Sequence, residues 1–162
     1  MKKTARIILP FLFALNLLPA IAQVTKNTKG NQTAAQKPKL PKLYTTLGIY
    51  RDSVVIPVDE ASRIINLPLI ITDDTKSYVV SDYQVLYRRN GVAEDEGMTG
   101  KVTPVSSMVS NHFKTTPLPD LWKNNIAQQL KPGEEIYFFD VVAKDPATGR
   151  LFFAPNLKII TR

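Results

Sequence analysis

The stretch KPGEEIYFFDVVAKDPATGR, residues 131 to 150, contains one apolar strand between two turns. Pro132 and Gly133 open it with residue types that favour a turn, and residues 134–144 then combine β-branched and aromatic side chains. The segment DPATG predicts a second tight turn, in which Gly149 can adopt a positive φ angle. The stretch therefore predicts the first arm of a β-hairpin and its closing turn.

The strand at residues 134–144 is expected to lie at the centre of a sheet. Successive side chains of a strand point to opposite faces, so its middle residues divide into two sets, both mostly apolar. One set is Ile136, Phe138, Asp140 and Val142, and the other is Tyr137, Phe139, Val141 and Ala143. Apolar residues on both faces are typical of a strand that is covered on both sides.

Asp140 is the charged exception among these middle residues. A buried carboxylate needs hydrogen-bond donors, so we interpret Asp140 as a structural residue that accepts bonds from backbone N–H groups. A catalytic role is the alternative, but the sequence fixes no second acid close to it.

Apolar and β-branched runs elsewhere predict further strands, with turn residues between them. Asn90-Gly91, followed by the acidic run at residues 94–97, predicts an exposed turn. Pro104 places its strand at a sheet edge or a bulge, because proline has no N–H for the ladder. The expected strands are residues 53–58, 64–72, 78–89, 102–109, 151–153 and 156–161, and together they predict a mainly β domain built as an antiparallel sandwich.

One segment has helical periodicity. Leu121, Trp122, Ile126 and Leu130 recur about every four positions after Asp120, a residue type that caps helices. This pattern predicts one short helix near residues 120–130 that lies over the sandwich. Trp122, the only tryptophan, is expected to anchor that helix to the core, with an exposed binding site as the alternative.

The N-terminus has the features of an export signal. Basic residues precede an apolar run from Ile7 to Leu18, and small residues then predict cleavage between Ala22 and Gln23. The run is too short and too interrupted for a membrane-spanning helix. Without cysteine the mature protein cannot be a lipoprotein, so we expect a periplasmic or secreted protein. The boundaries are residues 1–22 for the signal peptide, 23–43 for a Lys/Pro-rich flexible linker and 44–162 for one folded domain.

The positive charge of the chain is concentrated outside the expected domain. Of 21 basic residues, eight precede Tyr44, which leaves 13 against all 14 acidic residues and a net charge of minus one. A domain without a basic excess has little electrostatic attraction to nucleic acid, so we expect no nucleic-acid partner.

The run IAQQLKPGEEIYFFDVVAKDPATGRLFFAPNLKII, residues 126 to 160, resembles the C-terminal periplasmic domain of the GldM (PorM) family, gliding-motility and type IX secretion proteins of Bacteroidetes. The resemblance implies an immunoglobulin-like antiparallel β-sandwich that binds other envelope proteins, among them secretion or gliding components. Two departures are the cleavable signal in place of a transmembrane helix and the length of a single domain. The matching positions are Lys131, Pro132, Gly133, Glu134, Ile136, Tyr137, Phe138, Asp140, Ala143, Lys144, Gly149, Arg150 and Ile159.

The inventory of reactive residues argues against catalysis. The chain has no cysteine and one histidine, His112, so a thiol nucleophile and a multi-histidine metal site are both excluded. His112 lies in a polar segment and is expected to be solvated. The acidic groups at residues 73–74 and 94–96 lack the spacing of a calcium loop and are interpreted as solvated turns. We therefore expect no enzyme, no cofactor and no metal.

Two binding functions remain open. The first is a non-catalytic, exported module that binds proteins of the bacterial envelope, with self-association also possible. The alternative is a carbohydrate-binding β-sandwich, which would need aromatic residues that face solvent together. Its candidate site is Trp122 with Tyr83 and Tyr87, and Tyr78 nearby in sequence.

Overall fold

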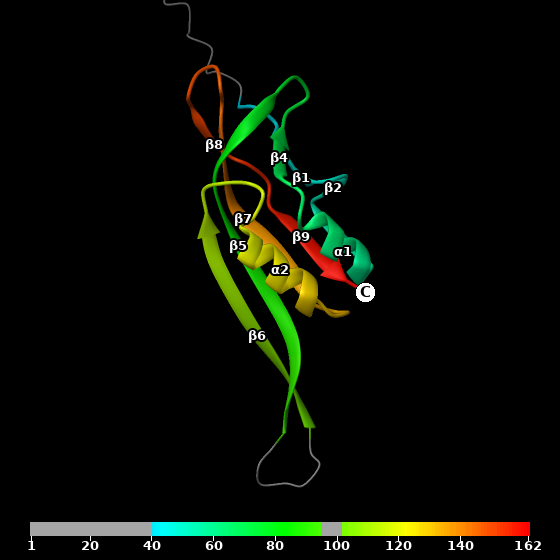
Figure 1. Cartoon of the computed structure of the whole chain (residues 1–162). Helices are drawn as coiled ribbons and strands as arrows, with labels where there is room; N and C mark the ends of the chain where they lie inside the picture. Colours follow the sequence, from blue (N-terminus) through cyan, green and yellow to red (C-terminus); the bar gives the residue numbers. More distant parts are fainter. Residues whose placement is uncertain (1–39, 95–101) are drawn as a thin grey trace, which may run out of the picture. The chain divides into compact units, whose positions relative to one another are not determined.

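The computed structural model describes residues 40–94 and 102–162, and these form a mainly β unit (Figure 1). Nine strands make one mixed sheet that is nearly closed into a barrel, and two short helices accompany it. Each helix is shorter than a membrane requires: none in the described ranges is long and apolar enough to cross a bilayer. The elements are β1 (Tyr44–Leu47), β2 (Tyr50–Arg51), β3 (Ser53–Ile56), α1 (Val58–Ile64), β4 (Leu69–Thr72), β5 (Ser77–Glu94), β6 (Val102–Phe113), α2 (Asp120–Gln129), β7 (Glu135–Lys144), β8 (Leu151–Phe153) and β9 (Leu157–Thr161).

The strands follow the order β2-β1-β4-β5-β7-β9-β3, with β6 beside β5 and β8 beside β7. The central position expected for residues 134–144 is confirmed, since β7 pairs with β5, β8 and β9. The expectation of a purely antiparallel sheet is wrong, because β3 runs parallel to β9. Apolar alternation predicts that a segment is a strand, but it carries no information on the direction of a distant neighbour.

A second helix occupies part of the chain that we expected to be extended. The predicted strands 53–58 and 64–72 shorten to β3 and β4, and α1 lies between them. Asp59 and Glu60 in its first turn stabilise the helix by interacting with the positive end of its dipole. Ala61 and Ile64 are buried and define the face that packs on the core. The predicted helix near residues 120–130 is confirmed as α2 (Asp120–Gln129), but α1 was not predicted.

A β-bulge changes which residues of β7 face the core. Gln84 pairs with Phe139 and Asp82 pairs with Val142, so two residues of β7 lie opposite Tyr83. Asp140 sits in this bulge with φ of 49°, a left-handed conformation that aspartate tolerates. The buried face is therefore Ile136, Phe138, Val141 and Ala143, not the strictly alternating set expected. Asp140 itself is exposed, and it accepts a hydrogen bond from the Gln84 side chain rather than from the backbone N–H groups expected.

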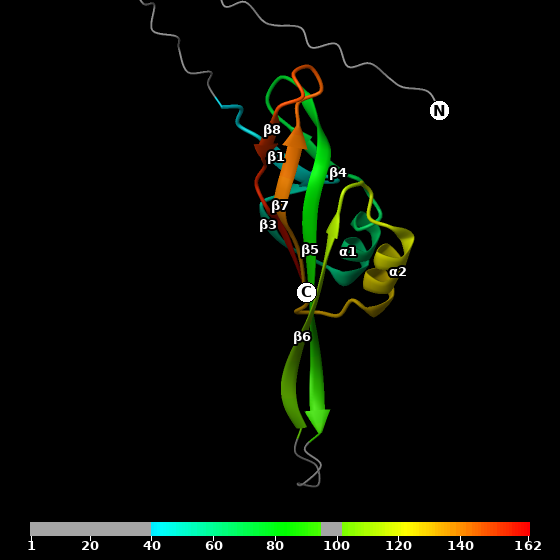
Figure 2. The same ribbon diagram turned by 90° about the vertical axis from the view of Figure 1, so that its left-hand side faces the viewer.

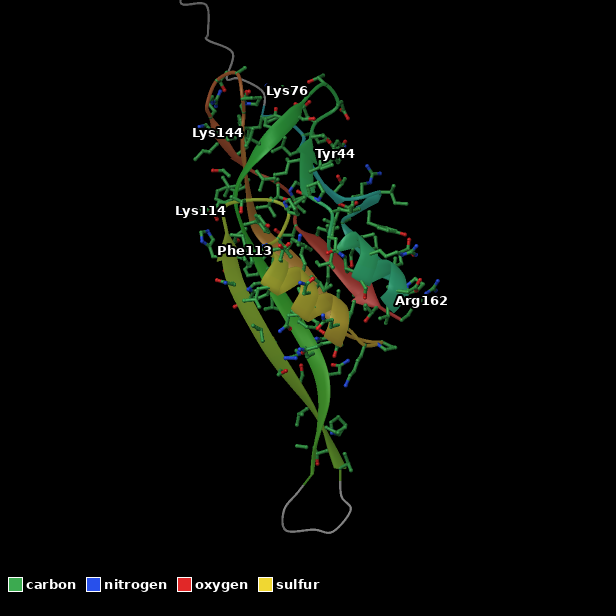
Figure 3. All side chains as sticks on the ribbon, in the orientation of Figure 1. Tyr44, Lys76, Phe113, Lys114, Lys144 and Arg162 are labelled. Carbon is green, nitrogen blue, oxygen red and sulfur yellow. The ribbon has the colours of Figure 1, made fainter. Side chains whose placement is uncertain are left out.

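Strand β5 continues well beyond the turn predicted at Asn90-Gly91. It pairs with β6 from Tyr83 opposite Phe113 to Glu94 opposite Val102. Both Figure 1 and Figure 2 show this two-stranded ribbon extending past α2 and β7. Figure 3 labels Phe113, the last residue of β6, where the strand reaches the rest of the sheet. The expected edge position of the Pro104 strand is confirmed, because β6 pairs only with β5 among the described residues.

The core contains side chains from the helices and from most strands, and Leu43, at the end of the expected linker, is buried in it. Trp122 is half-buried and packs edge-on against Phe113, with ring centroids 5.3 Å apart. This confirms its expected role as the anchor of α2. The residue that precedes the helix is Pro119 rather than the expected cap Asp120, whose carboxylate pairs with Lys123.

Candidate functional site

The outer part of the β5–β6 ribbon has free backbone edges. Arg88 opposite Glu135 is the last pair between β5 and β7, so beyond Arg88 the only strand paired with β5 among the described residues is β6. The Asn90 N–H of this part of β5 donates to the Glu134 carboxylate. The other edge of β6 faces no strand within residues 40–94 and 102–162. All of β6 except Phe113 is exposed. An unpaired row of N–H and C=O groups on a strand of twelve residues is a template for an added strand.

The side chains of β6 give that edge little protection. Proteins usually protect an exposed edge with charged residues, prolines or bulges. The sequence of β6, VTPVSSMVSNHF, has no lysine, arginine or carboxylate, and its one proline, Pro104, lies near its start. The exposed large apolar side chains of β6 are Val102, Val105, Met108 and Val109, of which Met108 is 67% exposed. The edge from Ser106 to Asn111 is thus both open and uncharged.

The two faces of the ribbon differ in what covers them. Register places Tyr87, Arg89 and Gly91 of β5 opposite Val109, Ser107 and Val105 of β6, and these six residues share one face. On this face, α2 lies beside the ribbon (Figures 1 and 2). Met108, opposite Arg88, points to the other face.

A groove runs between α2 and the ribbon. One hollow of about 230 Å³ is mostly apolar, and its lining includes Val109, Leu121 and Trp122. A second hollow of about 500 Å³ adjoins it along the ribbon and includes Val105 and Ser107. Arg89 lines both hollows, so they lie next to each other along the ribbon. We call this surface, together with the free edge of β6, the β6 groove.

The accessible charge of the β6 groove is positive. Arg89 is half-buried and lies over the ring of Tyr87, with its guanidinium carbon 5.6 Å from the ring centroid. It takes part in no salt bridge among the described residues. Lys131 also lines the groove and is exposed, whereas the one lining carboxylate, Glu134, is only 1% exposed.

Glu134 serves the fold and leaves its charge shielded. Its Oε2 accepts hydrogen bonds from the Tyr87 hydroxyl at 2.5 Å and from the Lys131 N–H at 3.0 Å. Its Oε1 accepts from the Asn90 N–H at 3.1 Å. Burial of the ring is the main cause that raises the pKa of Tyr87 above its usual range, and the hydrogen bond to Glu134 is the second cause. The network fastens the turn after α2 to β5 and so fixes one wall of the groove.

The aromatic site proposed for carbohydrate does not assemble. Tyr83 and Tyr87 are buried in the core, and Tyr83 donates its hydroxyl to the Thr115 carbonyl at 2.8 Å. Trp122 is half-buried beside them, and Tyr78 is also buried. The shared exposed face that this alternative requires is therefore absent from these four residues.

A different aromatic pair lies on the other side of the sheet. Tyr137 and Phe139 of β7 stack on each other, with centroids 5.3 Å apart and planes 10° apart. Because the two rings stack on each other, they do not lie side by side to form one flat aromatic surface for a sugar ring.

The residues that matched the family pattern lie in structural positions. Pro132 and Gly133 make the turn between α2 and β7, with Gly133 at φ of 81°. Phe138 is buried in the core, while Lys144 is exposed at the end of β7. The expected tight turn after β7 is confirmed, with Gly149 at φ of 71°.

Polar groups on the outer sheet face form pairs rather than a reactive site. His112 is exposed, as expected, but it lies in β6 rather than in a loop, and its Nε2 is 2.5 Å from Asp82 Oδ1. Asp140 accepts a hydrogen bond from Gln84 at 2.9 Å. No group of three or more histidine, aspartate or glutamate side chains in the described ranges could hold a metal ion.

The acidic pair at residues 73–74 forms a turn, as expected. Asp73 accepts hydrogen bonds from the Thr75 side chain and backbone, from the Lys76 N–H and from the Tyr78 hydroxyl. These bonds lower the pKa of the Asp73 carboxyl well below its usual range. The signal peptide, the Ala22–Gln23 cleavage site and most of the linker lie outside the described residues.

The β6 groove was not predicted from the sequence. The signal that could have revealed it is the uncharged run TPVSSMVSN at residues 103–111, which is unusual for an exposed strand. No family model and no curated protein matched the chain. The geometry of the ribbon is therefore the main guide to function.

Proposed function

We propose that this protein is an exported, non-catalytic module of the bacterial envelope that binds an extended segment of another envelope protein by strand addition to β6. The observation that carries the proposal is the free, uncharged edge of β6 next to an apolar groove. In strand addition, backbone hydrogen bonds give affinity and neighbouring pockets select side chains. The N-terminal export pattern supplies the location, a periplasmic or secreted one.

The resemblance of residues 126–160 to the GldM (PorM) C-terminal domain supports the same class of function. It suggests that the bound protein belongs to a secretion or gliding assembly. We also propose that the sheet is related to the immunoglobulin-like sandwich. In support, β5 pairs with β4 near its start and with β7 along its length, so it joins two sides that share one core.

Site-specific crosslinking tests the proposal. A photoreactive residue in place of Met108 is expected to crosslink to one extended segment of a partner in the native host, identified by peptide mapping. The same residue in place of Ile49, which is 87% exposed outside the ribbon, is the control. Equal crosslinking from both positions, or none from Met108, would count against strand addition at β6.

Proline substitution in β6 separates binding from folding. Successive N–H groups of β6 point alternately toward β5 and toward the free edge. One of the two substitutions Ser106→Pro and Ser107→Pro therefore removes an N–H donor from the free edge, and the other removes one that faces β5. The variant without the free-edge donor is expected to lose the Met108 crosslink while it keeps the melting temperature within a few degrees. If crosslinking survives both substitutions, the edge of β6 is not the binding site.

A further inference from the structure

From the charge and the register of the β6 groove, we infer that the segment added to β6 carries an acidic residue with an apolar residue two positions to each side. This inference rests on the proposed function, strand addition at β6, and specifies the chemistry of the partner. The acidic residue would lie opposite Ser107, and the apolar residues opposite Val105 and Val109.

Arg89 defines the acidic position. It lies opposite Ser107 of β6, so a residue added opposite Ser107 stands two strand spacings away, about 10 Å between Cα atoms. The side chain of Ser107, which lies between Arg89 and the added residue, is small. It therefore leaves room for a glutamate on the added strand to reach the Arg89 guanidinium. Arg89 forms no salt bridge among the described residues, and the exposed Lys131 adds a second positive charge to the groove.

The flanking positions are defined by the apolar side chains of the same face. Val105 and Val109 are 43% and 44% exposed, and Leu121 of α2 is 78% exposed at the rim. Side chains two residues apart on an added strand fall on the same face, opposite these two valines. Valine, isoleucine or leucine there would remove the exposed apolar surface from water.

A second copy of the chain fits this groove less well. Strand β6 contains no carboxylate, so β6 of a second copy offers nothing to neutralise Arg89. Antiparallel pairing about Ser107 would instead place the two Arg89 residues on the same face of the joined sheet. Charge complementarity therefore favours a foreign acidic segment over self-association.

Labelled peptides test the inference by fluorescence anisotropy with the full mature protein. The peptide TTVTETVTT is expected to bind about tenfold more tightly than TTVTKTVTT, because the lysine faces Arg89. Arg89→Gln should reduce this ratio to about twofold or less. Arg51→Gln, which changes an exposed arginine outside the groove, should leave the ratio unchanged. The peptide TTSTETSTT, without the apolar pair, should bind weakly.

The outcomes separate the inference from the proposed function. Equal affinity of the glutamate and lysine peptides, or no binding of TTVTETVTT, overturns the acidic pattern, while the Met108 crosslink judges strand addition independently. The purified protein could sediment as a dimer, and Ser106→Pro or Ser107→Pro could dissociate that dimer. These two results together would assign the free edge of β6 to a second copy of the chain. That result would also overturn the inference.

Discussion

Replacement of Glu134 by glutamine is expected to destabilise the domain by about 2 kcal/mol. The carboxylate accepts one hydroxyl and two backbone N–H groups, from Tyr87, Lys131 and Asn90, in a site that is almost fully buried. Glutamine keeps the shape but has one oxygen and one NH₂ group. In either orientation the NH₂ group faces a backbone N–H, which then loses its acceptor.

The magnitude follows from two opposing effects. A buried donor without an acceptor costs about 1–3 kcal/mol, and the remaining bonds weaken from charged strength to about 1 kcal/mol each. Loss of the buried charge offsets part of this cost, because none of the salt bridges of the described residues includes Glu134. The net effect is about 2 kcal/mol, or roughly a 1 M shift of the urea midpoint for a domain of this size.

Urea unfolding followed by the fluorescence of Trp122 measures the effect, since this single tryptophan packs against Phe113. Tyr87→Phe alone should cost about 1.5 kcal/mol, and the double variant with Glu134→Gln should show a coupling of about 1 kcal/mol. Asp74→Asn, an exposed carboxylate-to-amide control, should change stability by less than about 0.5 kcal/mol. A Glu134→Gln variant as stable as the wild type, or strict additivity with Tyr87→Phe, would refute the reasoning.

Three further predictions concern other parts of the domain. The hydrogen bond from Lys76, with help from the Ala147 N–H, lowers the pKa of Asp145 to about 2, so its stabilisation is present above the unfolded-state pKa of about 3.9 and lost as the pH falls toward 2. The melting temperature should therefore fall steeply below about pH 4, and Asp145→Asn should lower it at neutral pH and flatten its acid dependence; a parallel acid profile would contradict this. Burial raises the pKa of Tyr83 to about 12, so the stability that depends on its protonated hydroxyl is present below about pH 10 and lost above it. In an absorbance titration its ionisation should coincide with unfolding, and reversible ionisation in the folded state would be inconsistent with its burial. Asp140→Val should cost about 1–2 kcal/mol because φ is positive there, whereas Asp140→Gly should be close to neutral, and equal effects in thermal melts would argue against the bulge.

The parts of the fold that the sequence predicted well are those set by neighbouring residues. The helix at residues 120–129, the turns at Gly133 and Gly149, and the strands β7, β8 and β9 all follow from local periodicity and turn chemistry. The helix α1 was missed because its first and last residues, Val58 and Ile64, are β-branched and continue the two apolar runs that were predicted as strands.

The interaction surface depends on pairings that local patterns do not encode. Asn90-Gly91 has the sequence of a hairpin turn, yet both residues lie within β5. The pairing of β5 with β6, which continues beyond them to Glu94, keeps both residues extended. Arg89 and Trp122 are far apart in sequence and meet at one groove only because α2 folds back beside the ribbon. Pro104 indicated that its strand lies at an edge or a bulge, but the sequence could show neither the length of that free edge nor that Arg89 defines its charge.

The two strand irregularities explain why Arg89 faces the groove at all. Along β5, Tyr78 is buried near the start, but Tyr83, Val85 and Tyr87 are buried later, so the inward phase changes from even to odd positions. The change coincides with the register shift between Val80 and Asp82, and the bulge at Asp140 makes the matching change in β7. Without the shift in β5, strict alternation would turn Arg88 inward and Arg89 to the outer face. A one-residue irregularity in the core sheet therefore determines the chemistry of a binding surface several residues farther along the ribbon.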